Sequence, residues 1–272
     1  MKEEKVMFKQ DFLKRYLSNA PVPLAIERSW ECEILATRDF PRPVLDIGCG
    51  EGLFAHNLFE DKIDVGLDPN QRELARTKTF GLYDELLNCY GSEVPKEDQS
   101  YKTIFSNSVM EHIEEIEPVL KESHRLLADD GTMYLTLPTD KFDKYTLMNQ
   151  ILTKLGLLGL AERWRKFSNG FWAHYHYYTP EEWEEMFDRN GFKVTDKIEY
   201  GSKAQCMAND LFTPLCVGAF VVKKTTNEWF LFPKLRKFVA EKIYYPIWCK
   251  FAALKKPESG ESGLVFFALQ RK

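Results

Sequence analysis

A glycine-rich turn between two acidic residues is the stretch of the sequence best suited to chemistry. It reads D-I-G-C-G-E-G from Asp46 to Gly52 and follows a short apolar run. Gly48 and Gly50 allow the backbone to turn tightly and to approach a ligand where a side chain would clash, and the helix that follows begins with free N–H groups. Asp68 ends the next apolar run about twenty residues downstream, where a carboxylate can accept hydrogen bonds from both hydroxyls of a ribose. The pattern predicts a nucleotide-binding turn.

The spacing of the glycines distinguishes between kinds of nucleotide. A dinucleotide fingerprint reads G-x-G-x-x-G, and from Gly48 its last glycine would fall on Leu53, so this fingerprint fails. The segments V-L-D-I-G-C-G-E-G and V-G-L-D-P-N, which end at Gly52 and Asn70, closely resemble motifs I and II of class I S-adenosylmethionine-dependent methyltransferases. The stretches S-Y-K-T-I-F-S-N-S-V-M-E-H-I and G-T-M-Y-L-T-L-P-T resemble the fourth and fifth strand regions of that family. The resemblance covers residues 43–139, 179–200 and the last strand.

This resemblance implies S-adenosyl-L-methionine as the cofactor and S-adenosyl-L-homocysteine as the product. The glycine turn would line the methionine part of the cofactor, and the acid after the second strand would hold the ribose. Tyr90 stands where many relatives carry an Asp that accepts from the adenine amino group, so stacking on Tyr90 or a backbone amide near Gly91 would replace that contact. The predicted cofactor contacts are Asp46, Gly48, Cys49, Gly50, Asp68, Pro69, Tyr90, Gly91 and Asn107.

Strands alternate with helices along the first half of the chain, up to Thr139. This alternation predicts a parallel sheet joined by right-handed crossovers. The sequence favours helices over 71–80 and 179–191, the latter with Thr179 as N-cap, a third strand near 86–91, and one amphipathic helix over 146–164. The expected fold class is α/β: a Rossmann-like, seven-stranded, mostly parallel sheet with helices on both faces and helical insertions. The resemblance implies that strand seven is antiparallel.

The sequence divides into a core and three additions. We expect an N-terminal helical cap and a cofactor-binding core, followed by two insertions that flank a core helix and strand six. Because ligands bind beyond the carboxyl ends of the strands in this architecture, the additions are expected to select the acceptor. The expected units are 1–40 (cap), 41–140 (core), 141–178 (acceptor-side insertion), 179–201 (core helix and strand six), 202–262 (basic, aromatic helical insertion) and 263–272 (strand seven).

Three histidines lie where an acceptor would be activated. His112 follows an acidic residue just after the fourth strand, and His174 and His176 stand in the aromatic segment F-W-A-H-Y-H-Y-Y-T-P. If that segment is extended, alternation places both of its histidines on one face. Each of the three is a candidate general base for a hydroxyl acceptor, because the unperturbed pKa of histidine is near 6.5; packing is the alternative role. We expect His56 and His124 to be structural, and we expect no metal, because two histidines alone do not make a metal site.

The second insertion is basic in an acidic protein. The chain carries 37 Lys and Arg against 41 Asp and Glu, whereas residues 223–256 carry nine Lys or Arg against two Glu, with eight aromatic residues interleaved. Such a segment can lie on an anionic membrane, cover a bulky apolar substrate, pack on a second subunit, or form a helical subdomain with a solvated basic face. Aromatic residues can also stack on RNA bases, but the overall charge of −4 argues against nucleic acid as a partner.

The remaining composition bears on compartment and function. Six scattered cysteines without metal spacing indicate a reducing compartment. The charged start predicts no signal peptide, and the longest apolar run, near 211–222, is well short of the roughly 20 residues of a membrane span. We therefore expect a cytoplasmic protein, or one peripheral to the membrane. The expected activity is methyl transfer to oxygen or nitrogen of a small-molecule or lipid-like acceptor; the alternatives are an NAD(P)-linked oxidoreductase and a catalytically silent cofactor-binding scaffold.

Overall fold

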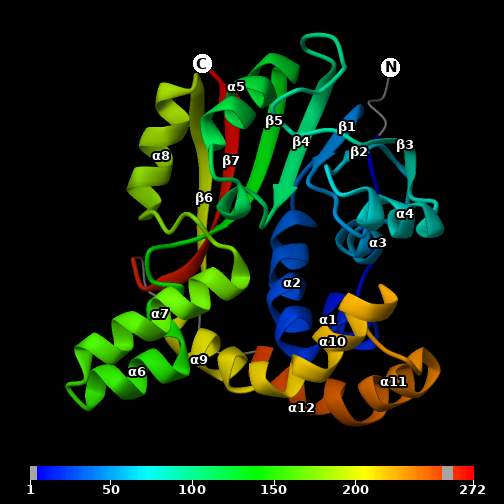
Figure 1. The fold of residues 1–272 in the computed structure, drawn as a ribbon. Helices are drawn as coiled ribbons and strands as arrows, with labels where there is room; N and C mark the ends of the chain where they lie inside the picture. The colour runs from blue at the N-terminus through cyan, green and yellow to red at the C-terminus, as the bar shows by residue number, and fades with distance from the viewer. Residues whose placement is uncertain (1–4, 253–259) are drawn as a thin grey trace.

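A seven-stranded sheet forms the centre of the molecule (Figure 1). The computed structural model describes residues 5–252 and 260–272. The strand order is β3-β2-β1-β4-β5-β7-β6, in which β1 to β5 are parallel and β7 runs antiparallel to both of its neighbours. The expected α/β fold class, with strand seven antiparallel, is confirmed. The strands are β1 Val44–Ile47, β2 Ile63–Leu67, β3 Tyr83–Leu87, β4 Tyr101–Asn107, β5 Leu127–Pro138, β6 Phe192–Ser202 and β7 Ser262–Arg271.

The strands divide their side chains between two hydrophobic cores, one on each face of the sheet. Along β7, Val265 and Phe267 enter one core, whereas Phe266 enters the other, as the two-residue period of a strand requires. Burial of one such side chain contributes about 1.5–3 kcal/mol to folding. The first core includes α5 Ile116–Leu126 and α8 Pro180–Arg189, and the second includes α1 Phe12–Asn19, α2 Val22–Leu35, α3 Leu53–Leu58 and α4 Gln71–Phe80.

The third strand begins earlier than the sequence suggests. Its pairing with β2 starts at Tyr83, opposite Ile63, and ends at Leu87, so the prediction of a strand near 86–91 is wrong. The chain leaves the sheet at Asn88, whose side-chain amide donates to the backbone carbonyls of Asp68 and Pro69, 3.0 Å away in each case. The residues after β3 therefore form a loop beside the end of β2 rather than a strand.

The helix predictions fare differently in the core and in the first insertion. In the core, α4 occupies the predicted residues, and α8 begins at the predicted cap: Thr179 Oγ1 accepts from the Glu182 N–H, while Glu182 accepts from the Thr179 N–H. The prediction of a single helix over 146–164 is wrong. Gly156 adopts a φ of +73° and separates α6 Leu147–Lys154 from α7 Leu158–Trp172.

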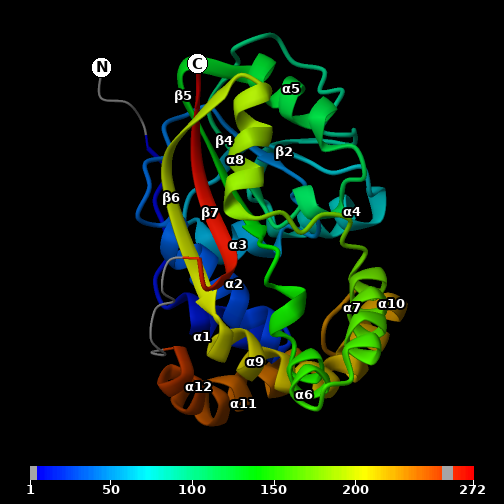
Figure 2. The same ribbon diagram turned by 90° about the vertical axis from the view of Figure 1, so that its left-hand side faces the viewer.

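The two insertions form a helical layer beyond the carboxyl ends of the parallel strands (Figures 1 and 2). No helix within 5–252 or 260–272 is long and apolar enough to cross a membrane. The layer contains α6, α7, α9 Lys203–Leu211, α10 Val217–Thr226, α11 Pro233–Val239 and α12 Tyr245–Ala252; the short helical turns are η1 Met110–His112, η2 Asp143–Tyr145, η3 Thr213–Cys216 and the π-helical η4 Ala240–Tyr244.

Candidate functional site

The glycine turn after β1 is held against the end of β2. The N–H groups of Gly48 and Cys49 both donate to the Leu67 carbonyl at 2.9 Å. Gly48 has a φ of +77°, and a Cβ atom there would lie 2.5 Å from Val109 Cγ1. Gly50 has a φ of +52°. Glycine is required at 48 for both conformation and space, and this leaves an open backbone edge beside the first turn of α3.

Two carboxylates flank this turn in different environments. Asp68, half-buried at the end of β2, accepts from the Gly50 N–H at 3.0 Å and from the Asn70 N–H at 2.8 Å. Burial raises its pKa, and these two backbone bonds oppose the shift. Asp46 is only 3% exposed and accepts from the Tyr83 hydroxyl at 2.6 Å. Burial raises the pKa of Asp46 to about 7, and the bond from Tyr83 acts in the opposite direction.

The residues predicted near adenine lie in the loop after β3. Tyr90 is 68% exposed. Gly91 packs closely against the sheet, because a Cβ atom there would lie 3.1 Å from the side chains of both Ile47 and Val119. The ring of Tyr90 is therefore accessible at the same edge of the sheet as Asp68, and Pro69 is joined to this loop by the bond from Asn88 to its carbonyl.

Asn107, predicted near the methionine end, belongs to a buried polar network that sequence reasoning missed. The centre of the network is Glu31 on α2, which is fully buried. Glu31 accepts from Arg28 at 2.7 Å, from Asn107 Nδ2 at 2.8 Å and from Ser108 Oγ at 2.9 Å. Tyr200 on β6 donates to it at 3.3 Å. The only sequence signal was that Arg28 and Glu31, two of the four charged residues of this largely apolar helix, are three residues apart.

A cavity of about 300 Å³ lies below the sheet, between α2 and the two insertions. Aromatic side chains form much of its wall, and charged groups enter it at a few points. None of its lining residues belongs to the glycine turn. Its lining includes Glu27, Arg28, His112, Phe142, Ser168, Trp172, His174, Tyr177, Cys206, Phe220 and Trp229.

His112 and His174 meet at this cavity, although they are far apart in the chain. Their ring centroids are 4.6 Å apart. His112 Nδ1 lies 3.2 Å from the Ala173 carbonyl, and His174 Nδ1 lies 2.6 Å from the Tyr177 hydroxyl. Burial lowers the pKa of His112 and lowers that of His174 to about 3, so both rings are neutral at neutral pH.

His176 is not among the residues that line the cavity. His176 Nε2 lies 2.8 Å from the Ile113 carbonyl, and its Nδ1 lies 3.1 Å from the Tyr178 hydroxyl. These bonds give His176 a structural role. His56, stacked on Phe80, and His124, edge-on to Phe192, pack as predicted.

Two buried acids near the cavity also escaped sequence reasoning. Glu27 on α2 lines the cavity, and its nearest cation is Arg28 Nη1 at 3.7 Å. Burial raises the pKa of Glu27 to about 7. Glu111, which precedes His112 in η1, is 3% exposed, and burial raises its pKa to about 8. Glu27 stands in no motif, whereas Glu111 belongs to the quoted stretch S-Y-K-T-I-F-S-N-S-V-M-E-H-I, where only His112 was singled out.

The basic insertion is attached to the glycine turn through Glu51. Lys223 on α10 donates to Glu51 Oε2 at 2.5 Å, and the Trp229 indole N–H donates to Oε1 at 2.6 Å. Arg76 on α4 completes the cluster at 3.0 Å. Trp229 also lines the cavity, so a single side chain contacts both the cofactor turn and the acceptor wall. Lys223 is thus paired with acids, whereas Lys224, Lys234, Lys237 and Lys242 of the same insertion are exposed.

A parallel sheet with a glycine turn after β1 and a carboxylate after β2 defines a Rossmann-like nucleotide-binding protein. The chain belongs to a family of methyltransferases, because the family model described as "Methyltransferase domain" matches residues 24–197. It is an S-adenosylmethionine-dependent methyltransferase, as the motif resemblance implied. Family membership replaces the alternatives of a dinucleotide oxidoreductase and a silent scaffold.

Individual relatives are distant. The mitochondrial ubiquinone biosynthesis O-methyltransferase of Bos taurus is 23% identical over 164 residues, which are 56% of this chain and 41% of that protein. The chain thus spans about two fifths of the length of that relative. A possible histamine N-methyltransferase from Thermotoga maritima superposes with a TM-score of 0.53 at 15% identity, covering 96% of this chain and 91% of that one. Geranyl diphosphate C-methyltransferase from Streptomyces coelicolor has a TM-score of 0.56 at 11% identity, covering 99% and 91%. These structures share the fold, and the relatives are named for transfer to oxygen, nitrogen and carbon.

Proposed function

We propose that this methyltransferase transfers the methyl group to an oxygen or nitrogen atom of a small, largely apolar acceptor bound in the cavity. The cavity carries the proposal: it lies beyond the carboxyl ends of β4 and β5, and His112 and His174 line it with neutral rings. Its volume of about 300 Å³ is at the lower end of the range for small-molecule sites. Its aromatic wall favours an apolar body, and the polar side chains that line it provide partners for a hydroxyl or an amine.

The residues around the glycine turn fit the cofactor. Gly48 and Gly50 leave the backbone open to a ligand, Asp68 presents a half-buried carboxylate at the strand end, and Tyr90 offers an exposed ring for adenine. We assign these residues, with Asp46, Cys49, Pro69, Gly91 and Asn107 beside them, to cofactor binding. When bound, S-adenosylmethionine supplies a methyl group on a sulfonium centre, which is a good electrophile.

This chain must then align the acceptor and remove one proton. A nucleophile aligned with the methyl group gains most of its rate advantage from fixed orientation and exclusion of water, which an enclosed aromatic wall provides. The acceptor's lone pair forms the new bond to carbon as the carbon–sulfur bond breaks, and the acceptor's proton passes to a base. His112 is a candidate for that base because its ring is neutral. Glu27, whose pKa is raised to about 7, lines the same cavity, and His174, whose pKa is lowered to about 3, is a weaker base.

The acceptor assignment is tested by filling the cavity. Ser168→Phe places a ring in it, and Lys166→Phe, two residues earlier on the exposed surface of α7, is the matched control. Methyl transfer is followed as S-adenosylhomocysteine release across a panel of hydroxyl and amine acceptors, and cofactor binding is followed by calorimetry. We expect Ser168→Phe to lose transfer while it binds S-adenosylhomocysteine like the parent. Full transfer by Ser168→Phe would overturn the cavity as the acceptor site.

The cofactor assignment is tested at Asp68. Asp68→Ala removes the carboxylate predicted to accept from the ribose, and we expect it to weaken S-adenosylhomocysteine binding by about 2 kcal/mol. Asp84→Ala on the neighbouring strand, an exposed partner of Lys62, is the control. Unchanged affinity in folded Asp68→Ala protein would contradict the assigned role.

We further propose that the helical layer contacts an anionic membrane and that the acceptor is lipid-like. Exposed apolar side chains and exposed lysines alternate along α11 and its flanks, a composition that suits a negatively charged lipid surface. Residues 223–256 carry nine Lys or Arg against two Glu, and this positive charge also favours an anionic surface. The exposed apolar residues are Leu231, Phe232, Leu235, Phe238, Ile243 and Ile247, and the exposed lysines are Lys224, Lys234, Lys237 and Lys242.

Vesicle sedimentation tests this contact. We expect binding to phosphatidylglycerol-containing vesicles, weak binding to pure phosphatidylcholine, and loss of binding in a Leu235→Ser, Phe238→Ser double variant. Met7→Ser, a similarly exposed apolar residue on the N-terminal segment, is the control. The surface would instead be assigned to self-association if the parent binds no vesicles and is a dimer by light scattering while the double variant is a monomer.

A further inference from the structure

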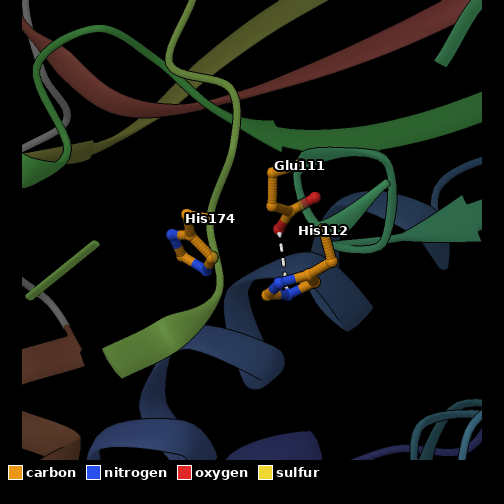
Figure 3. A group of neighbouring side chains, drawn as sticks. All are labelled: Glu111, His112 and His174. Atoms are coloured by element: carbon orange, nitrogen blue, oxygen red, sulfur yellow. Dashed lines mark ion pairs between the residues drawn. The ribbon is translucent and has the colours of Figure 1, made fainter. Parts of the chain in front are cut away.

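Glu111, His112 and His174 form a cluster at the edge of the acceptor cavity. Each offers one ligand atom, and these three atoms lie within 4.8 Å of one another (Figure 3). Glu111 Oε1 is 4.0 Å from His112 Nε2. No metal was expected from the sequence because two histidines alone do not make a metal site; the fold brings His112 and a carboxylate together with His174.

The Glu111 carboxylate is incompletely satisfied by the protein. Its side chain is buried, and its Oε2 atom has no hydrogen-bond partner within the described part of the chain. An orphaned buried oxygen costs stability and calls for an explanation in a natural protein. Figure 3 shows the carboxylate above the His112 ring, with His174 to the left of both.

The two histidines present suitable nitrogens. The Ala173 carbonyl can only accept, so His112 must donate from Nδ1, which leaves the Nε2 lone pair free. His174 uses Nδ1 for the Tyr177 hydroxyl, and its other ring nitrogen points toward His112 (Figure 3). A backbone carbonyl or polar group that holds the far nitrogen is the usual second shell of a metal-ligating histidine.

We propose that Glu111, His112 and His174 bind one divalent transition metal ion. Two imidazole nitrogens and one carboxylate oxygen form a donor set suited to zinc, manganese, iron or cobalt rather than to magnesium or calcium. Ligand atoms around one such ion stand about 3.3 Å apart for bonds of about 2.0 Å, so modest side-chain rotations close the cluster. Three protein ligands leave a position open toward the cavity.

That open position gives the metal a use. A hydroxyl acceptor bound there becomes more acidic and loses its proton to solvent more readily. In that case neither histidine could act as the base, because one ring nitrogen of each would bind the metal and the other is hydrogen-bonded to the protein. This use rests on the proposed function, whereas metal binding itself does not.

Cobalt titration tests the site. Full-length protein freed of metal by a chelator is titrated with CoCl₂ and followed by calorimetry and by the visible spectrum. We expect one ion per chain, with ligand-field bands and without thiolate charge-transfer bands. Glu111→Gln and His174→Gln should each weaken binding at least tenfold. His124→Gln is the control, because that ring packs on Phe192 away from the cluster.

Folding of each variant is checked by its affinity for S-adenosylhomocysteine. His174→Gln keeps the test valid if the more buried Glu111→Gln fails to fold. The absence of stoichiometric cobalt binding, or parental affinity in the folded variants, would overturn the proposal. If the protein binds cobalt but methylates no acceptor, the proposed function is contradicted and the metal site is not. Failure of one proposal can thus be distinguished from failure of the other.

Discussion

The cofactor turn and the acceptor cavity are built in opposite ways. The turn comes from one short segment, Asp46–Gly52, closed by Asp68 from the adjacent strand. The cavity is assembled from α2, the loop after β5, the end of α7 and the layer from α9 to Trp229. The first is local and backbone-dominated, and the second is long-range and made of side chains. This explains why the family and cofactor follow from a motif, whereas the acceptor depends on the insertions.

The two regions are joined at two points. Glu31 connects the cavity wall at α2 to Asn107 at the end of β4, and Glu51 connects the glycine turn to Trp229. Substitutions at these joints should affect both regions, and substitutions on either side should affect one.

The largest effect is expected at Glu31. Glu31→Gln removes a buried charge and leaves Glu27, 3.7 Å away, as the ion-pair partner of Arg28. We expect the free energy of unfolding to fall by about 3 kcal/mol, the lower end for a broken buried ion pair, as measured by chemical denaturation. Glu33→Gln, exposed on the same helix, should change stability little. Equal stability of both variants would show that Glu31 does not join the two regions.

A smaller effect confined to the cofactor side is expected at Gly48. Gly48→Ala forces a Cβ atom to within 2.5 Å of Val109 and should lower stability by about 2 kcal/mol, together with at least tenfold weaker S-adenosylhomocysteine binding. Gly81→Ala is a matched control, because Gly81 also has a positive φ but no atom lies within 4 Å of its Cβ position. Equal binding by the two variants would remove the turn from the cofactor site.

The cavity side should respond to pH through His174. Its pKa is lowered to about 3 in the folded chain and is near 6.5 when unfolded, so between these values the unfolded state binds more protons. Stability therefore falls as pH falls, by about 2 kcal/mol between pH 7 and pH 5. Buried acids such as Glu27, whose pKa is raised, act in the opposite direction, so the comparison is between the parent and His174→Gln in metal-free buffer. Parallel pH profiles of the two proteins would contradict a buried, neutral His174.

The smallest effect is expected at the joint between Trp229 and Glu51. Trp229→Phe keeps most of the cavity wall but loses the indole hydrogen bond of 2.6 Å. We expect a loss of about 1 kcal/mol in stability and a modest weakening of both cofactor and acceptor binding. Trp172→Phe trims the same wall without touching Glu51 and should affect the acceptor alone. Identical profiles for the two variants would mean that Trp229 does not couple the regions.

Local signals predicted some elements well and others poorly. The cap at Thr179 and the helix over 71–80 were readable because short-range hydrogen bonding and periodicity decide them. The position of β3 could not be predicted in this way, because its register depends on pairing with β2. The helix over 146–164 was predicted as one because its apolar pattern continues through Gly156, and only the observed left-handed φ shows the break.

The sequence by itself determined the class of cofactor and the order of the core, because a glycine turn and alternating strands are patterns of neighbouring residues. Only the tertiary structure decided which ionisable groups meet. It joined Glu31 to Asn107 and Ser108, brought His174 to Glu111 and His112, and placed His176 against the Ile113 carbonyl. The physical reason is that a side chain's burial and partners come from segments distant in the chain, and no local pattern encodes the distance between them.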